Sequence, residues 1–198
     1  MSDAAIPHHL GPAPRDAAIV AALGRGSIVL VGMMGSGKSS IGRRLAARLG
    51  IPFADADAEI EEAAGMSIAD IFEVHGESSF RSGEARVIAR LLEHGPQVLA
   101  TGGGAFMNPQ TRANIHAKGI SVWLKAEPDV LMRRLRRRND RPLLKTADPT
   151  ATLTNLLADR DPIYGEANLI VVSRDVPHDV IVEEIVTALR CNLGIADA

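Results

Sequence analysis

Residues 32–39 of this chain read Gly32-Met33-Met34-Gly35-Ser36-Gly37-Lys38-Ser39, which fits the phosphate-loop pattern G-x-x-x-x-G-K-[ST] at every fixed position. Just before it, Ser27–Val31 is apolar and partly β-branched, which predicts a buried strand. Just after it, Ile41, Leu45 and Leu49 recur every four residues and Gly50 follows, which predicts a helix over Lys38–Leu49. The motif therefore lies between a strand and a helix, the setting that phosphate binding requires.

This loop is expected to bind a nucleoside triphosphate together with Mg²⁺. Its glycines let backbone N–H groups converge on phosphate oxygens, and the N-terminus of the following helix adds partial positive charge. Lys38 can reach the β- and γ-phosphates, and the Ser39 hydroxyl can ligate Mg²⁺. A glycine-rich turn that matches by chance is the alternative, and the flanking strand and helix argue against it. The residues expected to contact the nucleotide here are Gly35, Ser36, Gly37, Lys38, Ser39 and Ser40.

Composition limits the class of protein. The chain has 198 residues, 46% of them hydrophobic, and a formal net charge of -2, which gives no sign of a nucleic-acid partner. No apolar run approaches the roughly 20 residues of a membrane span, and no secretory signal is apparent. A single cysteine suits a reducing compartment, so we expect a cytoplasmic protein without a membrane partner. Residues 1–24 are expected to form a mobile N-terminal tail and short helix, and residues 25–198 a single domain.

Short apolar strands alternate with helices along the chain. The expected strands are Ser27–Val31, Pro52–Asp55, Gln97–Ala100, Ile120–Leu124 and Asn168–Val172. The expected helices are Asp16–Leu23, Lys38–Leu49, Ala58–Ala64, a short helix capped by Ser67, Glu77–Glu93, and three that begin at Pro109, Pro128 and Pro177. This order predicts an α/β fold with a five-stranded parallel sheet covered by helices on both faces. Ligands of such sheets bind outside the carboxyl ends of the strands.

Two carboxylates follow the second expected strand. On extended backbone, Asp55 and Asp57 would point to one face. Beside a triphosphate, one of them can act near Mg²⁺ and the other near the hydroxyl that attacks. Either residue could instead simply cap the next helix. The apolar strand just before them favours the functional interpretation.

Two arginines are candidate anion ligands. Arg81 is three residues from Glu84, so the two can form an ordinary ion pair on a helix surface. A guanidinium also binds a carboxylate through two parallel bonds, which suits a small acidic substrate. Arg160 lies between Asp159 and Asp161, and pairing with one of these aspartates is as plausible as ligand binding.

Three consecutive glycines, Gly102, Gly103 and Gly104, directly follow the third expected strand. They permit close approach of the backbone to a ligand in a confined pocket. A flexible hinge is the alternative.

A dense basic cluster includes Arg134 and ends at Arg141. A solvated basic face and an RNA-binding arm are alternatives, but only 3% of the chain is aromatic, which gives little support for stacking on bases. The cluster better suits a mobile lid, at about residues 136–150, that brings arginine onto a transferring phosphate and excludes water.

In combination, these segments resemble shikimate kinases in order and approximate spacing over about residues 26–190. The segments that match are the loop 32–39, Asp55-x-Asp57, Phe80-Arg81-x-x-Glu84, Gly102-Gly103-Gly104, Arg141-Pro142-Leu143-Leu144 and Arg160–Tyr164. The resemblance implies a P-loop kinase fold, similar to nucleoside monophosphate kinases, with a mobile lid. It also implies ATP-dependent phosphorylation of the 3-hydroxyl of shikimate in the chorismate route to aromatic amino acids. Separately, we expect a monomer.

The resemblance also implies roles for individual residues. Lys38, Asp57 and Arg141 would be catalytic, with Arg141 on the lid. Ser39 would bind Mg²⁺ directly, Asp55 would act near it, and Arg134 would lie against adenine. The implied shikimate ligands are Asp57, Arg81, Gly102, Gly103, Gly104 and Arg160. Another small-metabolite kinase of this fold, such as a gluconate kinase, or a nucleoside monophosphate kinase is the nearest rival interpretation. A nucleotide-dependent switch is a second rival, although the chain carries no Asn-Lys-x-Asp guanine reader, which a GTPase switch would be expected to have.

Overall fold

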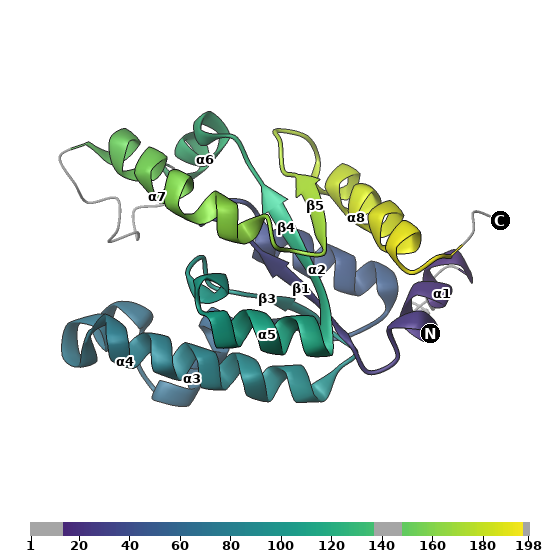
Figure 1. Ribbon diagram of the computed structural model, residues 1–198, viewed down its shortest axis with the longest axis horizontal. Helices are drawn as coiled ribbons and strands as arrows, with labels where there is room; N and C mark the ends of the chain where they lie inside the picture. Colours follow the sequence, from purple (N-terminus) through teal and green to yellow (C-terminus); the bar gives the residue numbers. More distant parts are fainter. Residues whose placement is uncertain (1–13, 137–147, 196–198) are drawn as a thin grey trace, which may run out of the picture.

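The computed structural model describes residues 14–136 and 148–195 as one sheet covered by helices (Figure 1). The strands are β1 (Ser27–Val31), β2 (Phe53–Asp55), β3 (Val98–Ala100), β4 (Gly119–Lys125) and β5 (Leu169–Val172). The α-helices are α1 (Pro14–Leu23), α2 (Lys38–Leu49), α3 (Ala56–Ala64), α4 (Ile68–Leu91), α5 (Pro109–Lys118), α6 (Pro128–Leu135), α7 (Pro149–Tyr164) and α8 (His178–Asn192). Two short 3-10 helices, η1 (Leu92–His94) and η2 (Ala105–Met107), flank β3.

All strand pairings are parallel, in the order β2-β3-β1-β4-β5. The prediction of a five-stranded parallel sheet in an α/β fold is therefore confirmed. The strand order reverses beside β1, since its neighbours β3 and β4 both come later in the chain. Ligands of open parallel sheets bind at such a switch point, outside the carboxyl ends of the strands. The phosphate loop leaves β1 at this point.

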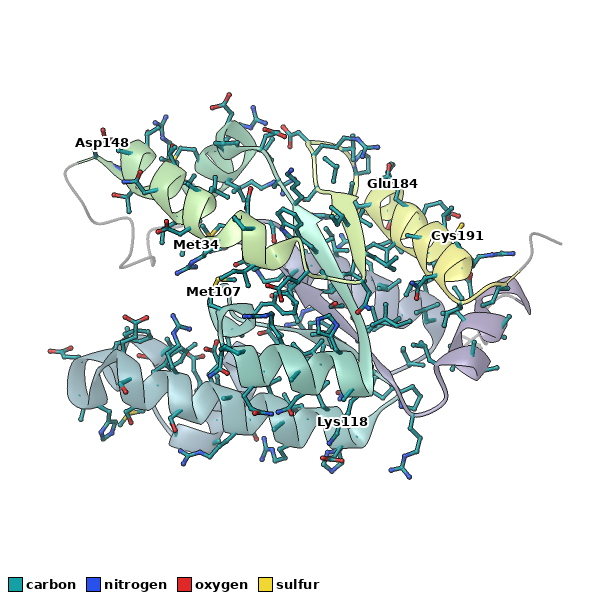
Figure 2. The ribbon with its side chains drawn as sticks, viewed as in Figure 1. Met34, Met107, Lys118, Asp148, Glu184 and Cys191 are labelled. Carbon is teal, nitrogen blue, oxygen red and sulfur yellow. The ribbon has the colours of Figure 1, made fainter. Side chains whose placement is uncertain are left out.

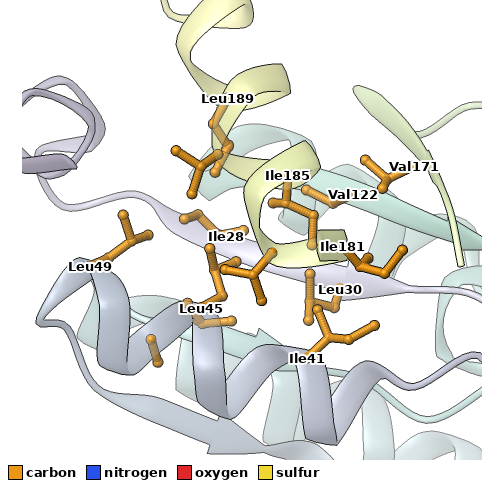
Figure 3. Close-up of a cluster of buried hydrophobic side chains, with 14 of the residues drawn as sticks. Ile28, Leu30, Ile41, Leu45, Leu49, Val122, Val171, Ile181, Ile185 and Leu189 are labelled. Carbon is orange, nitrogen blue, oxygen red and sulfur yellow. The ribbon is translucent and has the colours of Figure 1, made fainter. Parts of the chain in front are cut away.

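The two faces of the sheet bury separate apolar clusters, because alternate strand residues point to opposite faces. On one face, Ile28 and Leu30 of β1 pack against α2 and α8 (Figure 3). On the other, Val29 and Val31 pack with α4, α5 and the end of α7. Helix α1 joins the first cluster through Ile19, whose side chain is fully buried. Helices therefore cover both faces, as predicted.

Two expected helix boundaries are refined by the structure. Ser67 caps α4 as predicted, with its hydroxyl oxygen accepting from the Asp70 N–H at 3.2 Å. The run to Leu91 is broken at Gly76, whose φ of 77° and ψ of 167° are not helical, so the expected division into two helices holds. Helix α3 begins at Ala56, two residues earlier than expected, because the strand before it ends at Asp55.

Helix α7 was not predicted. Its N-terminus carries sequence signals that could have found it: the Asp148 side chain accepts from the N–H groups of Thr150 and Ala151, each at 3.0 Å, and Pro149 occupies the first helical position. Pro162 inside the helix obscures the pattern. The expected lid at 136–150 falls mostly outside the described residues, and its last two residues belong to α7.

Within the described ranges, no helix combines the length and apolar character that crossing a membrane requires.

Candidate active site

The phosphate loop turns sharply between β1 and α2. Gly35 and Gly37 adopt φ values of 82° and 97°, a left-handed region that side-chain-bearing residues rarely occupy. Gly37 is the N-cap of α2 and offers no side chain to cap the helix. The first N–H groups of α2 therefore remain available to an anion, together with the positive end of the helix dipole.

Lys38 holds its ammonium group inside this loop. Its Nζ donates to the carbonyls of Gly32 at 2.7 Å and Met33 at 2.9 Å, and the residue is only 8% exposed. The charge therefore lies at the loop, where it can meet the terminal phosphates of a nucleotide.

Arg134 of α6 joins the loop to the end of β5. Its Nη1 donates to the Ser173 hydroxyl at 2.9 Å and to the Gly35 carbonyl at 3.3 Å, and its Nη2 donates to the Arg174 carbonyl at 2.7 Å. Burial lowers the pKa of this guanidinium from its ordinary value. Ser173 in turn donates to the Ser36 carbonyl at 2.8 Å. The structure therefore brings Arg134 to the loop, through a serine that the sequence analysis missed.

Ser39 and Asp55 form an oxygen pair beside the loop. The Ser39 hydroxyl donates to Asp55 Oδ2 at 2.6 Å. The other carboxylate oxygen, Oδ1, caps α3 by accepting from the Asp57 N–H at 3.2 Å. Asp55 therefore acts both as the helix cap that was the alternative interpretation and as a neighbour of Ser39.

The expected arrangement of the acid pair on extended backbone is wrong. Strand β2 ends at Asp55, and Asp57 lies in the first turn of α3. The chain must turn into the helix here because Asp55 caps it. The turn directs Asp57 towards the glycine run rather than along the strand, and a Cβ placed on Gly102 would lie 2.9 Å from Asp57 Oδ1.

The glycine run 102–104 is packed on three sides. A Cβ on Gly102 would come within 2.5 Å of Glu84 Oε1. A Cβ on Gly103 would lie 3.2 Å from the Met34 nitrogen, and one on Gly104 would lie 2.7 Å from the guanidinium carbon of Arg81. This crowding explains why the positions at either end hold glycine. It favours the wall of a confined pocket over a free hinge.

Arg81 of α4 forms ion pairs with two glutamates of its own helix. Its Nη1 donates to Glu84 Oε2 at 2.8 Å, and its Nη2 donates to Glu77 Oε1 at 3.2 Å. The predicted pair with Glu84 therefore exists, but it is not a surface pair, because the Glu84 side chain is only 3% exposed. Burial acts to lower the pKa of Arg81, but the hydrogen bonds that it donates to Glu84 and Glu77 and the charges of both carboxylates together outweigh burial, so the pKa lies above its ordinary value.

Glu84 is a buried carboxylate whose place in the site the sequence did not reveal. Burial raises its pKa, and the attraction of Arg81 only partly offsets this effect. Its second oxygen, Oε1, has no hydrogen-bond partner among the described residues and faces Gly102. The carboxylate therefore orients the Arg81 guanidinium beside the glycine run.

Arg160 of α7 reaches the same run from the opposite side. Its Nη1 donates to the Gly103 carbonyl at 3.3 Å and contacts the Met33 sulfur at 3.8 Å. Within the part of the chain that the structure describes, no ion pair joins Arg160 to Asp159 or Asp161. The alternative interpretation of a pair with a flanking aspartate is therefore not observed.

A cleft of about 450 Å³ joins the two halves of this site at the carboxyl ends of the strands. Figure 2 labels Met34 in this region and Lys118 at the opposite end of the strands. The cleft is lined by Met34, Gly35, Gly37, Lys38, Ser39, Ser40, Asp55, Asp57, Thr101, Gly103, Arg134, Leu135, Asp175, Val176 and His178. Arg81 and Arg160 contact the glycine run at its margin. The predicted Arg141 lies outside the described residues.

Comparison with known proteins identifies the family of the chain. A profile of the shikimate kinase family matches residues 34–190, which is most of the chain. The chain belongs to the shikimate kinase family.

Individual shikimate kinases resemble it over nearly their whole length. The chain is 65% identical over 193 residues to the shikimate kinase of Bradyrhizobium diazoefficiens, covering 98% of this chain and 92% of that protein. It is 62% identical over 180 residues to the shikimate kinase of Rhodopseudomonas palustris, covering 91% and 89%. The solved shikimate kinase from Acinetobacter baumannii in complex with shikimate aligns with a TM-score of 0.83 at 36% identity, covering 88% and 98%.

Proposed function

We propose that this chain transfers the γ-phosphoryl group of ATP to the 3-hydroxyl of shikimate, giving shikimate 3-phosphate and ADP on the chorismate route to aromatic amino acids. Membership in the shikimate kinase family carries this proposal. The solved relative from Acinetobacter baumannii holds shikimate itself, at a TM-score of 0.83 to this chain. The arrangement of charges in the cleft supports the same conclusion.

The acceptor side suits a small carboxylic acid. Arg81 and Arg160 approach the glycine run from two different helices, so two guanidinium groups can bind one carboxylate between them. Gly102, Gly103 and Gly104 form the wall against which a ring can pack without meeting side chains. Both groups are guanidinium cations, which favours an anionic ligand.

Asp57 is assigned to the attacking hydroxyl. It lies in the first turn of α3, lines the cleft and faces Gly102. A carboxylate in this position orients a hydroxyl of the acceptor and accepts its proton as the phosphoryl group leaves ATP.

The nucleotide side supplies positive charge. Lys38 and the N-terminus of α2 stabilise negative charge on the transferring phosphoryl group. The phosphate contacts come from Gly35, Ser36, Gly37, Lys38, Ser39 and Ser40. Arg134 is assigned to the adenine, and Arg141 to the lid by the family resemblance.

Ser39 and Asp55 fit Mg²⁺. The hydroxyl and carboxylate oxygens are hard ligands that lie 2.6 Å apart beside the loop. Within the described residues, no group of three or more His, Cys, Asp or Glu side chains could hold a metal by itself. Two protein oxygens are nevertheless what Mg²⁺ uses beside nucleotide phosphates, with water completing its shell. When bound, the ion neutralises charge on the phosphates.

We also infer a cytoplasmic monomer, with residues 25–198 as the catalytic domain after an N-terminal segment 1–24. The net charge of -2 and the low aromatic content support the absence of a nucleic-acid partner. Sedimentation of the purified chain tests the monomer directly, since a dimer would double the mass of 21.0 kDa.

A coupled ADP-release assay tests the proposed activity. We expect ADP release to depend on shikimate and Mg²⁺, and phosphorus NMR to place the phosphate on the 3-hydroxyl. Gluconate and nucleoside monophosphates serve as competing acceptors. Turnover with gluconate but not shikimate would identify another small-metabolite kinase, and slow turnover that no acceptor stimulates would favour a nucleotide-dependent switch.

A further inference from the structure

Tyr164 carries a buried hydroxyl group to which the proposed function assigns no role. It is the last residue of α7 and is only 1% exposed. Its ring stacks on Trp123 of β4, with ring centroids 5.7 Å apart, and on Phe106 of η2 at 6.4 Å. Its hydroxyl donates a hydrogen bond to the Gly103 carbonyl. The residue therefore joins α7 to the middle of the glycine run.

The same carbonyl also accepts from Arg160, so two side chains of α7 hold one peptide unit. Arg160 and Tyr164 are four residues apart and lie on the same face of the helix. Because the peptide unit is planar and trans, a Gly103 carbonyl held by α7 turns the Gly104 N–H away from α7. The bond from Tyr164 thus sets the direction of donors in the wall of the site.

We propose that Tyr164 is a positioning residue for the acceptor, because its hydroxyl fixes the Gly103 carbonyl and thereby the spacing between the glycine run and Arg160. The inference rests on the proposed function, in which this run and Arg160 bind shikimate. The position of Gly103 is also limited by the phosphate loop, because Gly103 packs closely against the Met34 nitrogen. A shift of the run would therefore alter the acceptor side while α2 keeps the nucleotide side in place.

The hydroxyl remains a donor under all assay conditions. Burial raises the pKa of Tyr164 to about 12, so the group stays protonated and neutral at physiological pH. Arg160 also donates a hydrogen bond to the same oxygen, and its length of 3.3 Å is above the usual range for an N–H donor. Removing the hydroxyl therefore leaves the carbonyl with one imperfect partner.

Tyr164→Phe separates positioning from packing, because phenylalanine keeps the ring against Trp123 and Phe106. We expect the KM for shikimate to rise about five- to tenfold, the cost of one buried hydrogen bond, while the KM for ATP stays unchanged. The midpoint of thermal unfolding should change little, since the ring contacts remain.

Ser121→Ala is the matched control. Ser121 is a fully buried hydroxyl that donates to Asn168 Oδ1 at 2.7 Å and accepts from the Asn168 N–H at 2.9 Å. It secures the segment just after α7 to β4 and does not contact the glycine run. We expect this variant to lower the unfolding midpoint and to leave the KM for shikimate unchanged.

The outcomes distinguish the inference from the proposed function. A wild-type KM for shikimate in Tyr164→Phe, or equal rises in both KM values, would overturn the positioning role while leaving the kinase activity established. A similar rise in Ser121→Ala would also overturn it, because any loss of a buried hydroxyl near α7 would then suffice. If the wild-type chain shows no shikimate-dependent ADP release, the proposed function fails and the inference fails with it.

Discussion

The two halves of the cleft are built in different ways. The nucleotide half comes from one contiguous segment, residues 32–40, in which backbone geometry dominates: positive φ angles at glycines and the open N-terminus of α2. The acceptor half gathers Asp57 from α3, Arg81 from α4, the glycine run after β3 and Arg160 from α7. Its geometry depends on side chains that ion pairs and close contacts hold in place.

Because of this difference, we expect substitutions to have different effects in the two halves. A local backbone structure with a helix terminus binds phosphate wherever a strand and a helix flank it. A pocket assembled from four elements keeps its shape only if each element packs correctly on the others. Substitutions in the nucleotide half should therefore remove catalysis outright, and those in the acceptor half should alter selectively how shikimate binds and reacts.

Lys38→Met should have the largest effect. We expect kcat to fall about 1,000-fold, because the ammonium that stabilises the transferring phosphoryl group is lost. Steady-state kinetics with a circular dichroism spectrum would measure this loss in a folded protein. Lys118→Met is the control, since Lys118 lies at the amino end of β4 and pairs with Glu93. Near-normal turnover in Lys38→Met would show that this loop is not the catalytic centre.

Asp57→Asn tests the division between the two halves. We expect kcat to fall about 100-fold, because asparagine keeps the size but accepts no proton. Nucleotide affinity, measured by titration calorimetry, should stay within about threefold, since the effect belongs to the transition state and not to ATP binding. Asp129→Asn is matched to it, because Asp129 also occupies the first turn of a helix, α6, and is exposed. If ATP binding is lost while turnover at saturating ATP is unchanged, Asp57 must be assigned to the nucleotide half instead.

Arg81→Lys should have an intermediate effect confined to the acceptor. We expect the KM for shikimate to rise about tenfold, because lysine cannot supply two parallel charge-assisted bonds worth roughly 1.5–3 kcal/mol each. The KM for ATP should not change. Arg90→Lys on the same helix is the control, since Arg90 pairs with Glu59 at the surface. An unchanged KM for shikimate would show that Arg81 does not bind the substrate and that its pair with Glu84 is purely structural.

Glu84→Gln should give the smallest effect, seen as a dependence of stability on pH. Burial raises the folded-state pKa of Glu84 above its ordinary value of 4.5, so the folded chain binds this proton more tightly than the unfolded chain does. The stability that it contributes is therefore present below pH 4.5 and is lost as the pH rises through the folded-state pKa. Relative to Glu84→Gln, the wild type should lose free energy of unfolding as the pH rises above 4.5.

Urea denaturation at several pH values would measure this trend. Glu77→Gln is the control, because Glu77 is the other carboxylate partner of Arg81 and its side chain is 64% exposed. The difference in free energy of unfolding between the wild type and Glu77→Gln should not change with pH. Parallel curves for the wild type and Glu84→Gln would show that burial of this carboxylate has no energetic consequence.

The acceptor half shows where sequence reasoning stops. Arg81, Arg160 and the glycine run could be singled out because their chemistry suits a small acid. The local pattern still left ordinary ion pairs open for the two arginines and a flexible hinge open for the glycines. The burial of Glu84 and the bond from Tyr164 could not be derived, because both depend on α4 and α7 meeting at the glycine run. Asp57 was placed on extended backbone, and only the cap at Asp55 explains why it lies on a helix instead.

The sequence by itself determined the nucleotide half and the class of fold. Adjacent residues specify the strand, the loop and the helix there, since glycine conformations and apolar spacing are local properties. The tertiary structure decided the order of the strands, the presence of α7 beside the glycine run, and which carboxylates became buried. These features depend on contacts between residues far apart in the chain, and the free energy of such contacts comes from packing that no single segment contains.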